Sequence, residues 1–144
     1  MNNTTYNQWT ILNQVQNAHL ETLIDAFLLD RKAQNMTKGT LFFYKNKLVM
    51  FVQFCDMQEV KFITQITPDI IRQYLFYLNN EGHNAGGIHA YYRTLKTFLR
   101  WLENEIEPEG WKNPIKKVKA PKNPIEPLDP ANIDDVRAML DCLP

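Results

Sequence analysis

The stretch NAGGIHAYYRTLKTFLRWLE, residues 84–103, decides the fold class that we predict for this chain. Its large apolar residues recur every three or four positions, which is the spacing of one face of an α-helix. These residues are Ile88, Tyr91, Tyr92, Leu95, Phe98, Leu99 and Leu102. Asn84 is a suitable N-cap, because its side chain can accept a hydrogen bond from an N–H group of the first turn. The stretch therefore predicts a helix from about Ala85 to Glu103 that packs one face into a core.

The same helix carries a second face made of basic residues. On a helical wheel with about 100° per residue, four of them fall within an arc of roughly 60°. They are His89, Arg93, Lys96 and Arg100. The row is about 16 Å long at a rise of about 1.5 Å per residue, and it favours contact with phosphates along a duplex. The alternative is an ordinary amphipathic helix with a basic exposed side, although such sides usually mix charges through i,i+4 pairs.

Gly86 and Gly87 follow the cap directly. Free N–H groups at a helix start bind phosphate, and glycine removes the side chain that would keep a phosphate away. The alternative is a loose turn after Gly82. Asn84, Gly86 and Gly87 are therefore candidate DNA contacts.

Basic residues are segregated along the chain although the formal net charge is zero, with 16 basic and 16 acidic residues. Thirteen of the basic residues lie in three stretches that contain no acid, which are residues 31–50, 82–102 and 112–122. If the fold gathers these stretches, one face becomes positive and attracts polyanions, of which nucleic acid is the commonest. The alternative is that such runs are only solvated surface.

Three further helices are predicted before the proline-rich part of the chain, at about 20–34, 38–55 and 68–80. Thr37 is the expected N-cap of the 38–55 helix, and Thr67 is the expected N-cap of the 68–80 helix. Hydrophobic residues make up 44% of the 144 residues, enough for one globular domain. We predict an all-α fold, a compact bundle of four to five helices.

The head of the 38–55 helix carries a weaker phosphate-binding signal. Thr37, Lys38 and Thr40 stand at its start, and Lys45 lies about two turns beyond Lys38 on the same side. Hydroxyls and a lysine at a helix N-terminus suit a phosphate. Simple capping by Thr37 is the alternative, and both can hold together.

Proline dominates the next part of the chain. Six of the eight prolines fall between residues 108 and 130, which predicts a semi-stiff linker. Its lysine-rich part, 112–122, is expected to be extended and to follow a phosphate backbone. The candidate contacts there are Lys116, Lys117, Lys119 and Lys122. A solvated linker without a role is the alternative.

The last residues predict a short helix with an apolar face, formed by Ile133, Val136 and Leu140. Such a helix is unstable alone, so we expect it to begin a second domain and the chain to be a fragment. The expected organisation is an N-terminal tail or short helix, a helical domain, a linker and the start of a truncated domain. The corresponding ranges are 1–18, 19–107, 108–130 and 131–144.

Other function classes find little support. Two cysteines, Cys55 and Cys142, make no disulfide framework, and Cys55 is expected to be a buried structural thiol. The three histidines lack metal-ligand spacing, and no catalytic constellation or cofactor motif is present. No secretory leader and no apolar run of about twenty residues is present. We expect a cytoplasmic protein with no metal, cofactor or membrane partner.

Several segments resemble, in their order and spacing, the tyrosine recombinase (phage integrase) family. TKGTLFFYKNKLVMF (37–51) is similar to the second helix of that family's core-binding domain, and ITPDIIRQYL (66–75) to its third. LKTFLRWL (95–102), followed by Asn113-Pro114, is similar to the fourth helix and exit. Pro127-Leu128 and the apolar pattern after it look like the opening of the catalytic domain.

The resemblance implies a SAM-like N-terminal domain that clamps double-stranded DNA with its second and fourth helices. It implies that the tyrosine, arginine and His-x-x-Arg residues of the family's chemistry belong to a missing C-terminal domain. None can be placed here, so the fragment is expected to be no enzyme. The implied partners are duplex DNA, the missing catalytic domain and, in the intact protein, further copies in a homotetramer on DNA.

Two rival functions stay open at this level. A helical protein-interaction module would dock a partner through exposed Tyr6, Trp9 and Trp101. A self-contained enzyme would need a concave pocket in which His83 or His89 meets a carboxylate.

Overall fold

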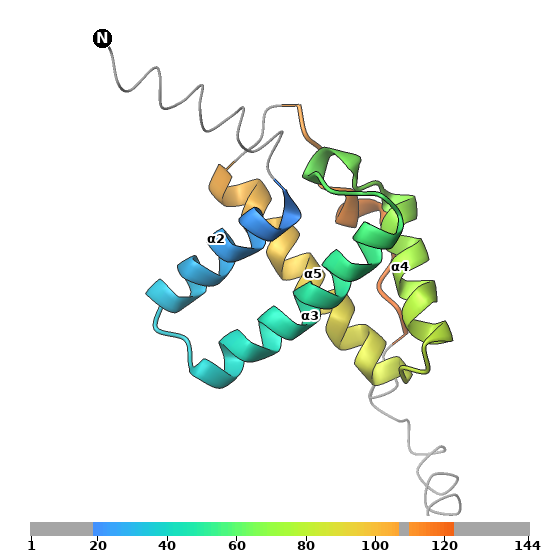
Figure 1. Cartoon of the computed structure of the whole chain (residues 1–144), viewed down its shortest axis with the longest axis horizontal. Coiled ribbons are helices and arrows are strands. Elements are labelled where there is room, and N and C mark those ends of the chain that lie inside the picture. Colours follow the sequence, from blue (N-terminus) through green and yellow to red (C-terminus); the bar gives the residue numbers. More distant parts are fainter. Residues whose placement is uncertain (1–18, 107–109, 123–144) are drawn as a thin grey trace, which may run out of the picture.

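The computed structural model describes residues 19–106 and 110–122, and all regular structure in these ranges is helical (Figure 1). The all-α prediction is confirmed, because no strand forms among the described residues. Predicted features in 1–18 and 123–144, including Cys142 and the expected last helix, lie outside them. The helices are α2 (Leu20–Ala33), α3 (Lys38–Met57), α4 (Pro68–Asn80) and α5 (Ala85–Ile106), with 3₁₀ turns η1 (Ile63–Gln65) and η2 (Pro114–Lys117).

Helix starts follow the capping residues that the sequence indicated. The Thr37 side chain accepts a hydrogen bond from the Thr40 N–H at 3.1 Å. The Thr67 side chain accepts one from the Ile70 N–H at 3.2 Å. Asn84 Oδ1 accepts a hydrogen bond from the Gly87 N–H at 2.7 Å. Gly82 closes the preceding helix with a φ of +90°, a backbone conformation that favours glycine. All three predicted caps are confirmed.

Phe27 lies at the centre of the core, where α2, α3 and α5 meet. It is fully buried, and its ring packs edge-on against Tyr44, Phe98 and Trp101, with centroid distances of 5.6, 5.5 and 5.5 Å. Edge-to-face pairs add stability beyond the burial of area. In Figure 1, α2 and α3 form a hairpin across α5, and α4 covers the other end of α5. This packing fixes which face of α5 reaches the solvent.

Cys55 is the buried structural thiol that the sequence predicted. Its side chain is fully buried. Burial, aided by the neighbouring Asp56 carboxylate, raises the pKa of the Cys55 thiol to about 12. The thiol is therefore protonated and unreactive at neutral pH.

The segment after α5 corrects one prediction. Residues 112–122 are not extended throughout, because 114–117 form η2, and Ile115 and Val118 are buried at 3% and 7% exposure. Arg72 of α4 donates a hydrogen bond from Nη2 to the Lys117 carbonyl oxygen at 3.0 Å. The proline spacing predicted a linker. It does not indicate whether Ile115 and Val118 pack against the helical domain.

Packing of this segment makes a first testable prediction. Ile115→Ala is expected to lower the free energy of unfolding by about 2 kcal/mol, because it removes a buried side chain. Urea unfolding of the chain, followed by circular dichroism, measures the change. Lys119→Ala, on an exposed neighbour, is the matched control and should be neutral. Equal stability of both variants would mean that 112–122 is a solvated linker after all.

Candidate nucleic-acid interface

The basic row of α5 lies on the solvent side of the helix. Arg93 and Arg100 are exposed, and His89 and Lys96 are partly exposed. The opposite face is buried, with Phe98, Leu99 and Leu102 completely covered. We call the four residues the α5 basic row: His89, Arg93, Lys96 and Arg100. The predicted separation of a packed face from a basic face is therefore what the structure shows.

No carboxylate neutralises the α5 basic row within the described residues. The ion pairs there join Arg31 to Asp30, Arg72 to Asp69 and Lys116 to Glu103. None involves the row. Its positive charge consequently faces solvent unpaired by the described part of the chain, as an anion-binding surface requires.

A shallow groove between α3 and α5 borders the row. It has a volume of about 250 Å³, and six residues line it. They are Phe43, Tyr44, Ala90, Arg93, Thr94 and Thr97. Arg93 belongs to both the row and the groove, so the cationic surface continues into a concave one.

Short side chains of α5 make the groove possible. The Thr94 hydroxyl donates to the Ala90 carbonyl oxygen at 3.0 Å, and the Thr97 hydroxyl donates to the Arg93 carbonyl oxygen at 2.9 Å. These bonds hold the hydroxyls against the helix. The groove therefore stays open toward Phe43, which is 42% exposed on the facing side of α3.

Lys47 is a candidate that sequence reasoning missed. Its Nζ lies 4.1 Å from the Tyr91 ring centroid and 5.1 Å from the Phe43 ring centroid. It therefore adds a cation from α3 beside the groove. The sequence indicated only that Lys47 lies in an acid-free stretch, one turn after Phe43. Its place beside the groove depends on the packing of α3 on α5.

Two predicted residues of α3 lie elsewhere. Lys38 and Lys45 line a groove between α2 and α3, not the one that Arg93 lines. On the α3 wheel they stand about 140–160° from Phe43. The structure does not bring them to the α5 basic row.

The threonines at the head of α3 are occupied locally. Thr37 caps the helix, and its hydroxyl donates to the Thr40 hydroxyl oxygen at 2.9 Å. The capping alternative therefore holds for Thr37. Thr40 is partly exposed, one turn before Tyr44, and on the wheel it stands about 60° from Phe43.

Gly87, near the start of α5, serves the cap. The Gly87 N–H already donates to Asn84 Oδ1, so it is not free for a phosphate. A Cβ at Gly87 would lie 3.3 Å from that oxygen, a tight contact that glycine avoids. Gly86 is partly exposed at the same end.

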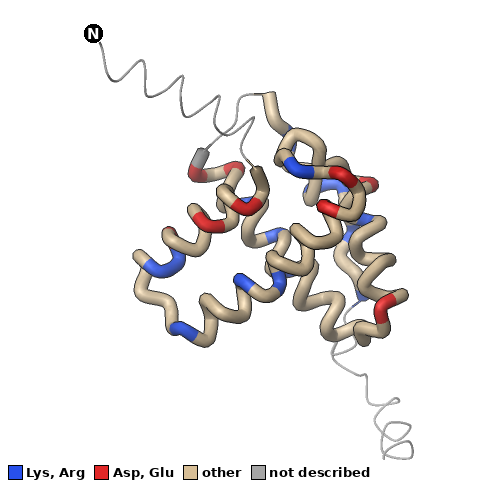
Figure 2. The backbone as a smooth tube through the Cα atoms, viewed as in Figure 1, with Lys and Arg blue, Asp and Glu red and all other residues tan. Residues whose placement is uncertain are grey.

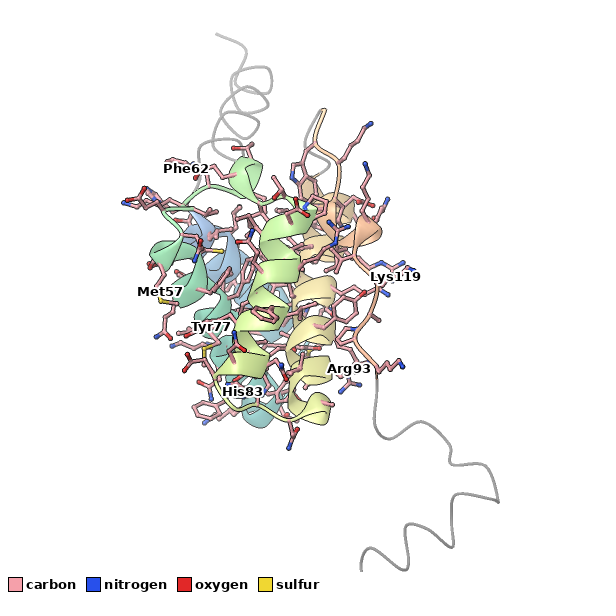
Figure 3. The ribbon with its side chains drawn as sticks, turned by 90° about the vertical axis from the view of Figure 1, so that its right-hand side faces the viewer. Met57, Phe62, Tyr77, His83, Arg93 and Lys119 are labelled. Carbon is pink, nitrogen blue, oxygen red and sulfur yellow. The ribbon has the colours of Figure 1, made fainter. Side chains whose placement is uncertain are left out.

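One lysine of the segment 112–122 contacts α5. Lys116 Nζ pairs with Glu103 of α5 at 2.8 Å, which ties this segment beside the helix. Lys117, Lys119 and Lys122 are exposed. Figure 3 shows Lys119 on the same side of the molecule as Arg93, with Met57 on the opposite side. Lys119 and Arg93 therefore lie on one side of the fold.

Fold and charge together define a small all-α domain that presents a basic row on one of its helices. Residues 19–101 match the family described as the phage integrase SAM-like domain, and the chain belongs to that family. It is also 25% identical, over 111 residues, to the tyrosine recombinase XerC of Oceanobacillus iheyensis. That alignment covers 77% of this chain and 34% of the relative, so the chain spans about a third of the relative's length.

The predicted family is thus confirmed. No solved structure matched the chain. In 19–106 and 110–122, no helix is long and apolar enough to cross a membrane, and no cluster of three or more potential metal ligands forms.

Proposed function

We propose that this chain is the DNA-binding domain of a site-specific tyrosine recombinase, and that it clamps duplex DNA at the recombination core site. Membership of the phage integrase SAM-like family supports the class of function. The observation that carries the proposal is the α5 basic row, which has no ion pair within 19–106 and 110–122 and which borders the α3–α5 groove.

The α5 basic row provides the main contacts. Arg93, Lys96 and Arg100, with His89, bind phosphates and reach toward base edges. The row is about 16 Å long, close to half of a duplex turn of about 34 Å. Lys47 extends the contact from α3, and Thr40, one turn before Tyr44 on the same helix, adds a hydroxyl.

The exposed lysines of 112–122 follow the phosphate backbone beside α5. Lys117, Lys119 and Lys122 are the exposed members with no ion pair to the described residues, whereas Lys116 must first leave Glu103. Asn84, Gly86 and Gly87 approach a phosphate only at the exposed start of α5. DNA contact by Lys38 and Lys45 stays a prediction. It requires the DNA to pass around the start of α3.

The activity of the intact protein forms part of the same proposal. Strand cleavage and rejoining would belong to a catalytic domain beginning at about residue 131, with the helical domain and linker before it. Four copies would act together on DNA. The fragment itself would bind weakly, because half of the clamp is absent, and would not catalyse.

The protein-interaction alternative has less support. Trp101 is only partly exposed, and its ring packs on Phe27 in the core. It is therefore a poor docking residue, and Tyr6 and Trp9 lie outside the described residues.

Salt dependence tests the proposal. The affinity of the chain for a labelled duplex, measured by fluorescence anisotropy, should fall steeply with salt, with a log–log slope of about −4.5 to −6.3 for five to seven phosphate contacts. Arg93→Gln with Lys96→Gln should make the slope shallower by about 2. Absence of binding at low salt, or identical slopes for both proteins, would overturn the proposal.

A further inference from the structure

The outer side of the α2–α3 hairpin carries large apolar side chains in contact with solvent. Leu29 is 68% exposed, Phe42 67% and Val49 40%. Leu28 and Leu41 lie between them in a groove of about 520 Å³ along the two helices. Isolated exposed apolar residues are ordinary, but a continuous strip along two helices marks an interaction surface.

Charges on this side are sorted by position. The groove near the hairpin turn is bordered by Lys32 and Lys38, and the adjoining groove at the other end by Glu21 and Asp56. Figure 2 shows basic residues at the end of α2 and the start of α3, and acidic residues at the start of α2.

Asp25 and Lys45 line both grooves and complete the set. The two grooves thus hold three acids and three lysines, Glu21, Asp25 and Asp56 against Lys32, Lys38 and Lys45, and Lys61 lies beyond Glu21 and Asp56. A face of this composition has no net charge. The α5 basic row, in contrast, contains basic residues only.

We propose that the α2–α3 side binds a second copy of this chain through a two-fold axis that passes near the middle of α3. A two-fold interface brings the same surface of both copies together in opposite directions. Each lysine end then meets an acidic end, so Lys38 of one copy approaches Asp56 of the other. The strip of Leu29, Phe42 and Val49 is covered at the same time.

The distribution of lysines and acids along the α2–α3 side favours a second copy of the chain as the partner. A surface that is positive at one end and negative at the other is complementary to itself only when reversed. A parallel arrangement would place like charges together, which is strongly unfavourable. The interface requires no DNA, and it leaves the α5 basic row free.

The size of the surface predicts weak association. Two adjacent helices offer about 500 Å² per copy, below the roughly 800 Å² of a standard stable interface. We therefore expect a dimer that forms in the micromolar to millimolar range and dissociates on dilution.

Complementary charge reversals test the two-fold pairing. Lys38→Glu with Lys45→Glu makes the side acidic, and Asp25→Lys with Asp56→Lys makes it basic. Sedimentation equilibrium of the 144-residue chain should show a dimer for the native protein. Each variant alone should have a dissociation constant raised by about 100-fold, and their equimolar mixture should regain association.

Controls separate this inference from DNA binding and from misfolding. Arg93→Glu with Lys96→Glu should leave the dimer unchanged, and Leu29→Ser with Phe42→Ser should abolish it while circular dichroism stays native. A native protein that is monomeric up to about 1 mM, variants that dimerise like the native chain, or a mixture that fails to associate would each overturn the proposal.

Discussion

Replacing Arg93 and Lys96 together by glutamate is expected to weaken binding to duplex DNA by about 100-fold or more at low salt. Both side chains belong to the α5 basic row, and neither forms an ion pair within the described residues. The substitution removes two phosphate contacts and places two negative charges against the DNA. Loss of counterion release and added repulsion act in the same direction.

Fluorescence anisotropy with a labelled duplex measures this loss. Lys32→Glu with Lys61→Glu is the matched control, because it changes the net charge equally at exposed positions outside the row. The control should lose only about 10-fold or less through the general field. Similar losses in the two proteins would show that net charge, and not this surface, determines affinity.

Replacing Phe27 by alanine is expected to lower the free energy of unfolding by about 3–5 kcal/mol. The side chain has 0% exposure and packs against rings from α3 and α5. The Arg31 guanidinium carbon also lies 4.8 Å from its ring centroid. Truncation would leave a cavity at the junction of three helices, and the loss is large against a typical stability of about 5–15 kcal/mol.

Urea unfolding measures the Phe27 effect. Phe42→Ala is a matched control, since it makes the same chemical change at a site that is 67% exposed on α3. At dilution, where the chain is monomeric, the control should change stability by less than about 0.5 kcal/mol. Comparable losses at both sites would mean that Phe27 is not the centre of the core.

The helices could be predicted because their signals are local. A cap joins residues three apart, as Asn84 and Gly87 do, and an apolar stripe repeats within a single helix. The α5 basic row could be predicted for the same reason. When one face of a helix is buried, the residues on its other side are fixed by periodicity alone.

Positions that depend on two elements could not be predicted. Lys47 lies beside the α3–α5 groove only because α3 crosses α5 there, and Lys38 and Lys45 line another groove because of the same crossing. The burial of Ile115 depends on a free surface on α4. In each case the deciding contact joins residues far apart in the sequence, and no local pattern encodes it.

The sequence by itself determined the all-α class, the helix starts, the basic row and the resemblance to phage integrases. Only the tertiary structure decided which cations share a surface with that row and which border the α2–α3 side. The physical reason is that helix formation depends on bonds between near neighbours, whereas the grouping of charges depends on the angles at which helices pack.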